Sequence, residues 1–148
     1  MISLIAFNGA DLLKSIDYRT ETKAHACNGV NYGFDINTWT SRFVTTCSKS
    51  KNSWEQRIQF LDAETIIAPE KTHQVTSLDS LLNLYPEIVD TDIKVGCNCP
   101  AFKYFYSYII TQLDSDLEKE ERYPYIRNPQ LDGSFCKHLA TIVRKYLI

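Results

Sequence analysis

Two short cysteine motifs place the strongest constraint on how this chain folds. Cys97 and Cys99 are separated by one residue, and Cys136 and His138 repeat that spacing further along the chain. Three thiolates and one imidazole form a donor set that closes a tetrahedral zinc site. The residues therefore predict one structural zinc ion that ties two distant segments of a 148-residue chain together.

The residues beside the two motifs fit this interpretation. Pro100 redirects the chain after Cys99, and Gly133 lets the later loop turn toward the site. Cys136 opens the C-terminal helix, whose positive N-terminal end favours a thiolate. Two alternatives stay open. The cysteines are simply buried small residues, or Cys136 is a nucleophile with His138 as its base, for which a separation of two residues is poor geometry.

All five cysteines are expected to be reduced, whether as zinc ligands or as free thiols. The chain has five cysteines, an odd number, and no secretory signal is recognisable, which argues against a disulfide framework and favours a reducing compartment. A second metal site is a minor alternative, and its ligands would come from His25, Cys27, Cys47 and His73.

Composition excludes several classes of protein. Hydrophobic residues make up 44% of the chain and charged residues 23%, which is typical of a globular domain. The formal net charge of −2 gives no general attraction to nucleic acid or anionic lipid. The sequence contains no apolar run of about 18 residues that would span a membrane. It also lacks the common catalytic motifs, so we do not expect an enzyme.

The first half of the chain has the patterns of β-strands. Residues 54–61 alternate between apolar and polar side chains, which indicates a half-buried strand. Residues 39–47 are rich in β-prone residues, and Asn28-Gly29 predicts a hairpin turn. Residues 64–68 can form another strand, whereas residues 8–16 predict a short helix. The result is an antiparallel meander of three to five strands.

The second half is expected to be mainly helical. Residues 69–74 are read as a linker, and Ser77 caps a short helix over residues 78–85. Residues 92–97 form a short strand that leads into the first cysteine motif. Pro100 then opens an amphipathic helix, and residues 136–148 form the C-terminal helix.

These expectations define an α+β fold in one compact domain. Residues 1–74 contribute the antiparallel β-meander with its short N-terminal helix, and residues 75–148 contribute a zinc-clasped helical module.

The two motifs and their flanks resemble a SWIM-type zinc finger, Cys-x-Cys followed by Cys-x-His. The strings KVGCNCPAFKY (residues 94–104) and NPQLDGSFCKHL (residues 128–139) resemble more closely the variety found in tailed-bacteriophage proteins, and the likeness covers about residues 92–147. It implies Zn²⁺ bound by Cys97, Cys99, Cys136 and His138. It also implies a role in binding protein or nucleic acid, and the phage variety suggests a protein of the virion or its assembly.

The functional expectation is a non-catalytic structural or assembly protein of a bacteriophage-like virion, located in the virion or the host cytoplasm. Its partners would be other protein subunits, and Trp39, Tyr104 and Tyr108 would be available for those contacts. The alternative is a SWIM-type module that binds nucleic acid. The acidic run at residues 114–121 disfavours that alternative, because phosphate contacts require positive charge.

Overall fold

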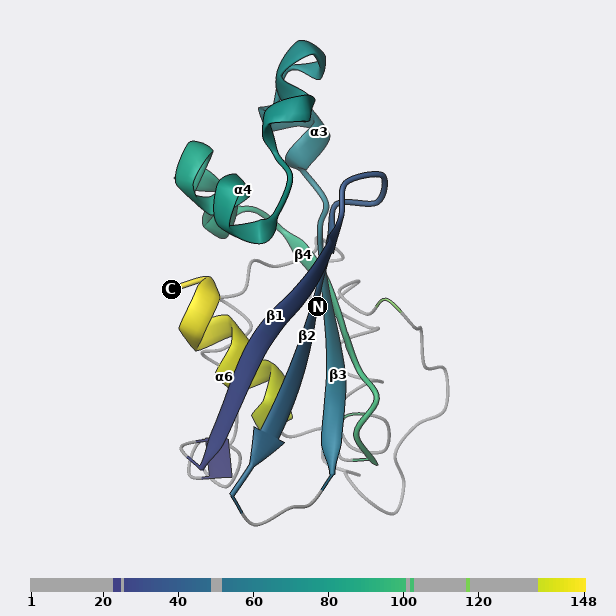
Figure 1. Ribbon diagram of the computed structural model, residues 1–148, viewed down its shortest axis with the longest axis vertical. Helices are drawn as coiled ribbons and strands as arrows, with labels where there is room; N and C mark the ends of the chain where they lie inside the picture. Colours follow the sequence, from purple (N-terminus) through teal and green to yellow (C-terminus); the bar gives the residue numbers. More distant parts are fainter. Residues whose placement is uncertain (1–22, 25, 49–51, 101, 103–116, 118–135) are drawn as a thin grey trace, which may run out of the picture.

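A four-stranded antiparallel sheet forms the frame of the protein (Figure 1). The computed structural model describes residues 23, 24, 26–48, 52–100, 102, 117 and 136–148. The strands are β1 (Cys27–Asp35), β2 (Thr40–Cys47), β3 (Ser53–Phe60) and β4 (Ile93–Cys97), and they lie in the order in which they occur in the chain. The expected α+β class and antiparallel meander are therefore confirmed. β4 belongs to the second half of the chain but completes the same sheet.

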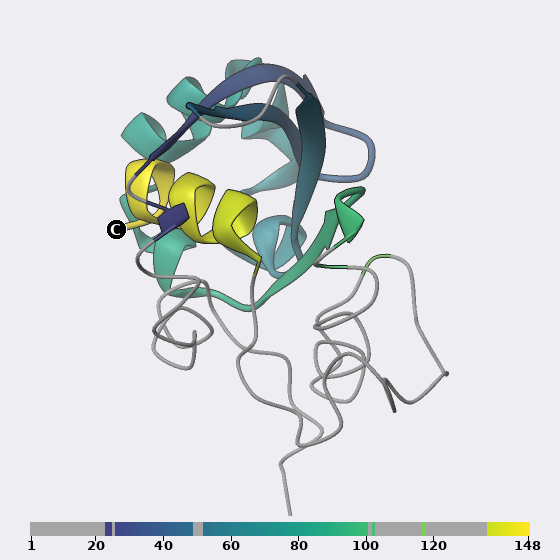
Figure 2. The same ribbon diagram turned by 90° about the horizontal axis from the view of Figure 1, so that it is seen from below.

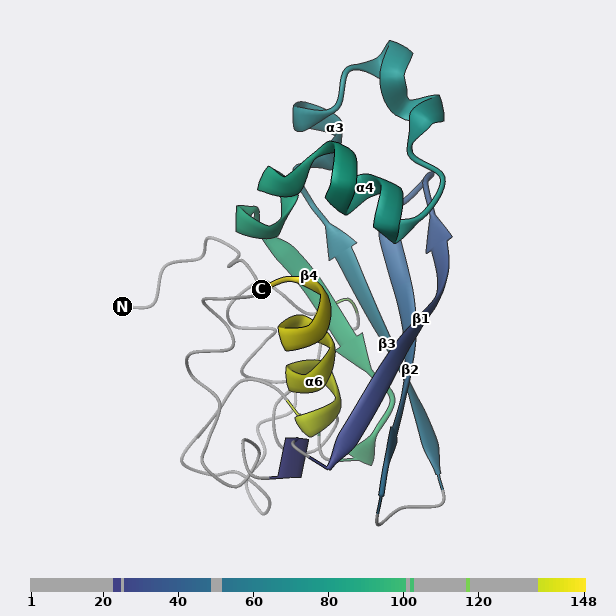
Figure 3. The same ribbon diagram turned by 60° about the vertical axis from the view of Figure 1, so that its left-hand side comes forward.

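The C-terminal helix α6 (Lys137–Tyr146) lies in the hollow of this sheet. Figure 2 shows the sheet curving around the helix, and Figure 3 shows the two side by side. α6 packs chiefly against β1 and β2. Its apolar stripe consists of Leu139, Ile142 and Val143, all of them fully buried. Burying this stripe removes water from the helix and from the inner face of the sheet at once.

The inner face of β3 follows the alternation expected from the sequence. Gln56, Ile58 and Phe60 are buried, and Arg57 and Gln59 between them are only half-buried. The main core cluster joins these side chains to residues from the other strands and helices, among them Phe43, Leu78, Leu81, Val95, Leu139 and Ile142. One connected core therefore includes residues from both halves of the chain.

A helical excursion connects β3 to β4 and lies beyond one end of the sheet (Figures 1 and 3). It contains α3 (Ala63–Ile66), η1 (Pro69–Gln74), α4 (Leu78–Leu84) and η2 (Pro86–Asp90). The predicted cap at Ser77 is confirmed. Its hydroxyl accepts a hydrogen bond from the backbone of Ser80, and the Ser80 side chain accepts one in return from the Ser77 backbone.

Side chains of α6 cover part of the free edge of β1. The Lys145 ammonium donates a hydrogen bond to the carbonyl of Gly29 at 2.7 Å. The backbone N–H of Asn31 donates to the Tyr146 hydroxyl at 3.0 Å. Unpaired edge groups invite pairing with other chains, so these bonds block such pairing along this part of the strand.

The predicted hairpin turn at Asn28-Gly29 is wrong, because both residues lie inside β1. Gly29 pairs with Thr45 and faces α6. A Cβ atom there would overlap the end of the Ile142 side chain. The glycine therefore permits close packing of a helix against the strand and does not form a turn. The turn between β1 and β2 lies at residues 36–39.

Two further local expectations differ from the structure. Residues 64–68 do not form a strand, because Ala63–Ile66 is a short helix. Residues 69–74, expected to be a linker, form a 3-10 helix that begins at Pro69. The predicted helix at 8–16 lies outside the described residues, as does most of the helix predicted from Pro100. In the part of the chain that the structure describes, no helix is long and apolar enough to cross a membrane.

Trp39 is not available for partner contacts as expected. Its side chain is 6% exposed and packs edge-on against Phe34, with the ring centres 6.2 Å apart. Its backbone adopts a positive φ of 53°, and its carbonyl accepts a hydrogen bond from Phe60. Tyr104 and Tyr108 lie outside the described residues.

Candidate metal centre

The first cysteine motif lies at the C-terminal end of β4. Cys97 is the last residue of the strand, and the next residue, Asn98, is still hydrogen-bonded to β3. The Asn98 backbone N–H donates to the carbonyl of Glu55, and the Asn98 side-chain oxygen accepts from the Glu55 backbone N–H at 2.8 Å. This double contact fixes the turn that brings Cys99 inward, where it is 1% exposed.

The second motif lies at the start of α6. Cys136 is the N-cap residue and is fully buried, and its carbonyl accepts the helical hydrogen bond from Ala140. His138 lies in the first turn and is 3% exposed. Because the thiol of Cys136 does not cap the helix, it remains free to face the first motif.

The structure brings the four predicted ligands together into one cluster that could hold a metal ion. One donor atom from each of Cys97, Cys99, Cys136 and His138 lies within 4.8 Å of the other three. Between the two motifs, Cys97 Sγ lies 4.0 Å from His138 Nδ1. A tetrahedron with metal–sulfur bonds of about 2.3 Å has edges of about 3.8 Å. A small contraction of the cluster would therefore give that geometry.

Hydrogen bonds to sulfur also suit a site that holds thiolates. The backbone N–H of Phe102 donates to Cys99 Sγ at 3.3 Å. The side-chain amide of Gln56 donates to Cys97 Sγ at 3.4 Å. Both N–H groups point at sulfur atoms, which carry negative charge when the cysteines bind a metal as thiolates.

The three thiols differ in their affinity for protons. Burial raises the pKa of the Cys97 thiol to about 12 and also raises the pKa of the fully buried Cys136. Hydrogen bonds from Cys136 and then Cys97 lower the pKa of Cys99. Without a cation, Cys97 and Cys136 therefore hold their protons more tightly than Cys99 does. A divalent cation that binds the thiolates would displace the protons that the thiols carry.

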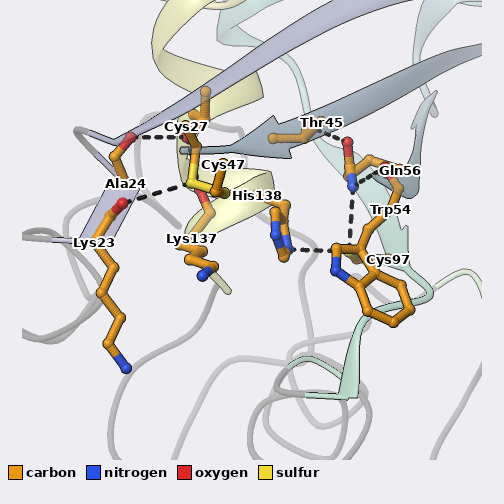
Figure 4. The surroundings of a disulfide bond; sticks show 11 residues. Lys23, Ala24, Cys27, Thr45, Cys47, Trp54, Gln56, Cys97, Lys137 and His138 are labelled. Atoms are coloured by element: carbon orange, nitrogen blue, oxygen red, sulfur yellow. Dashed lines mark hydrogen bonds between the residues drawn. A yellow bond between two sulfur atoms is a disulfide. The ribbon is translucent and has the colours of Figure 1, made fainter. Parts of the chain in front are cut away.

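The expectation that all five cysteines are reduced thiols is wrong for Cys27 and Cys47. These residues face each other across β1 and β2 and form a disulfide (Figure 4). The antiparallel register brings their Cα atoms to 4.0 Å from one another, a consequence of pairing that local sequence does not reveal. Cys97, Cys99 and Cys136 are free.

This disulfide also removes the cysteines of the second metal site that the sequence left open. Cys27 and Cys47 are bonded to each other and offer no thiolate. His73 is an exposed residue of η1, and His25 lies outside the described residues. Among the described residues, the only cluster of three or more potential ligands from His, Cys, Asp and Glu is the Cys97 cluster.

Sequence reasoning missed the polar residues behind the cluster. Gln56 and Thr45 are both completely buried on the inner face of the sheet, and their side chains are hydrogen-bonded to each other. A signal was present, because Gln56 occupies an inward position of the alternating strand β3. A buried polar residue at such a position requires a partner.

Comparison of the chain with protein-family models, with curated proteins and with solved structures finds no match.

Proposed function

We propose that this chain is a non-catalytic, zinc-binding structural protein. The observation that carries the proposal is the convergence of the three free thiols and the imidazole of His138 within 4.8 Å. Soft thiolates with one imidazole favour zinc over cations that prefer oxygen ligands, such as Mg²⁺ and Ca²⁺. Four protein ligands leave no position for a reactive water, so the ion would stabilise the fold and catalyse nothing.

The zinc ion would join the end of β4 to the start of α6. These elements are far apart in sequence, and the ion would add a link between them at one end of the core. The spacing of the proposed ligands, Cys-x-Cys followed by Cys-x-His, supports a site of the SWIM type. Metal binding to such a site contributes directly to folding free energy.

The proposed role is that of an assembly component of a bacteriophage-like virion, with other protein subunits as partners. The resemblance of residues 94–104 and 128–139 to phage SWIM-type strings supports this setting. The disulfide between Cys27 and Cys47 also favours the virion over the host cytoplasm, because disulfides persist in oxidising surroundings. Bound zinc would meanwhile protect the three remaining thiolates from oxidation.

Nucleic-acid binding is the alternative, and two of the three cations of α6, Arg144 and Lys145, give it little support. Lys145 contacts the Gly29 carbonyl and the Asn28 side chain, so its charge is already engaged. Arg144 also has an interaction partner. Sedimentation with and without DNA at two salt concentrations distinguishes the two roles. An assembly protein self-associates or binds subunits, whereas a DNA-binding module forms a complex that dissociates as salt rises.

A further inference from the structure

The side chain of Gln56 bridges the sheet and the cysteine cluster. Its Nε2 donates to the Trp54 carbonyl at 2.8 Å and to Cys97 Sγ at 3.4 Å. Its Oε1 accepts from the Thr45 hydroxyl at 2.5 Å. Figure 4 shows this amide between Thr45 on one side and Cys97 on the other. One N–H of the Gln56 amide is therefore available to the cluster, and it donates to Cys97 Sγ.

The neighbours of Gln56 determine the orientation of its amide. The Trp54 carbonyl accepts hydrogen bonds only, and a metal-bound thiolate at Cys97 does the same. A flipped amide would place Oε1 against both acceptors, which is unfavourable. The Thr45 hydroxyl can donate to Oε1 as it does in the structure. The amide N–H therefore points at the sulfur.

The backbone holds Gln56 and Cys97 opposite each other. They are register partners of β3 and β4, so their separation is set by strand pairing. Gln56 and Thr45 are both 0% exposed, so water does not compete for these bonds. A buried donor fixed in this way acts on a sulfur more strongly than a mobile surface group would.

We propose that Gln56 is a positioning residue of the metal centre, which orients Cys97 and stabilises its thiolate, and that Thr45 holds Gln56 in place. This inference rests on the proposed function, because it requires a metal at the cluster. Three thiolates around one divalent cation leave an uncompensated negative charge in a largely buried site. The Gln56 N–H offsets part of that charge at Cys97. Outer-shell partners of this kind typically change metal affinity by about 10–100-fold.

The test uses the full chain loaded with zinc or Co²⁺. Gln56→Met keeps the length of the side chain and removes the amide. Gln59→Met is the matched control, since Gln59 lies on the same strand but donates to the Thr38 carbonyl, away from the cluster. We expect Gln56→Met to transfer zinc to a competing chelator at least about tenfold faster than wild type, and Gln59→Met to transfer it at the wild-type rate.

A spectroscopic readout separates positioning from a general effect on packing. The sulfur-to-cobalt charge-transfer band of the Co²⁺ form reports on the thiolates directly. We expect it to move to lower energy in Gln56→Met, because a thiolate without its hydrogen bond gives up an electron more easily. Thr45→Val keeps Gln56 and frees its amide, so a smaller shift in the same direction is expected. This second variant also provides the test if Gln56→Met does not fold.

The outcomes separate the inference from the proposed function. A wild-type protein without a charge-transfer band overturns the proposed metal centre itself. A wild-type protein with the band, but with unchanged band energy and zinc-transfer rate in Gln56→Met and Thr45→Val, overturns only the role of Gln56. Faster zinc transfer and a shifted band in these variants, with a wild-type Gln59→Met, support it.

Discussion

The sulfur of Cys97 lies 4.0 Å from Nδ1 of His138, although 41 positions of the chain separate the two residues. One residue ends the edge strand β4, and the other lies in the first turn of α6. The sheet and the helix packed in its hollow therefore meet at a cluster of potential metal ligands. A bound ion there would lock the two elements together in addition to their apolar contacts.

Loss of a ligand should destabilise the protein as a whole. We expect Cys99→Ser to lower the free energy of unfolding by more than about 3 kcal/mol, because metal binding is coupled to folding. Thermal unfolding would show this as a fall in Tm of about 6–12 °C. Excess chelator should reduce the Tm of wild type in the same way and leave the Tm of Cys99→Ser unchanged. If the chelator does not change the Tm of wild type, and Cys99→Ser has the Tm of wild type, the protein does not contain a structural metal.

The disulfide predicts a specific pattern of chemical labelling. In denaturant with chelator and no reductant, an alkylating reagent should modify Cys97, Cys99 and Cys136 only. Cys27 and Cys47 should react after reduction, and peptide mass spectrometry measures both results. Alkylation of all five cysteines without reductant would show that the disulfide does not form.

Removal of the disulfide should weaken the fold without emptying the metal site. The bond joins residues 20 positions apart, and closing a loop of that size stabilises a protein by about 3 kcal/mol. We expect the double variant Cys27→Ala/Cys47→Ala to lose about that amount in chemical denaturation and to keep its bound metal. Loss of the metal from this variant would instead show that the site depends on the hairpin.

A side chain at Gly29 should be accommodated only if the Ile142 side chain moves. A Cβ at Gly29 would overlap the Ile142 side-chain end and lie 3.0 Å from Thr45 Oγ1, so Gly29→Ala should cost about 1–3 kcal/mol. Gly33 is the matched control in the same strand, because a Cβ there would meet its nearest atom, in Arg42, at 3.8 Å. We expect Gly33→Ala to change stability by less than about 0.5 kcal/mol.

A second substitution tests the cause of the Gly29 effect. If the Ile142 side chain is responsible, Gly29→Ala should cost less in the presence of Ile142→Val, and a double-mutant cycle of unfolding free energies measures that coupling. Equal costs of Gly29→Ala in both backgrounds would place the cause elsewhere.

Metal affinity should fall as the pH falls. The pKa values of Cys97 and Cys136 are raised by burial, so both thiols hold their protons at neutral pH until a cation displaces them. We expect Cys97 and Cys136 to release these protons when the metal binds. Calorimetric titration in buffers with different ionisation enthalpies measures the number of protons released. A metal affinity that stays constant between pH 6 and pH 8 would show that thiols are not the ligands.

The sequence predicted the elements whose signals are local. The alternation of β3 and the cap at Ser77 depend on neighbouring residues, and both are confirmed. The candidate ligand set could be named because zinc chemistry restricts the residue types and their spacing, so Cys97 and His138 could be paired without knowledge of the fold. That they converge is a property of the tertiary structure.

The errors came from residues whose conformation depends on distant contacts. Asn28-Gly29 has the composition of a turn, but Gly29 lies in a strand where the Ile142 side chain approaches closely. The Cys27–Cys47 bond follows from the register of two strands, which the odd cysteine count concealed. The role of Gln56 could not be predicted, because its partner Cys97 lies on another strand.

The metal content of the natively purified protein shows whether Cys97, Cys99, Cys136 and His138 form a structural zinc site. Elemental analysis of wild type, with the double variant Cys97→Ser/Cys136→Ser as the control, measures zinc per chain. We expect about one zinc ion per wild-type chain and none in the variant, since a closed tetrahedral site needs all four ligands. Wild-type protein that neither contains zinc nor takes it up from solution, or a variant that holds as much zinc as wild type, would contradict a structural zinc site at these residues.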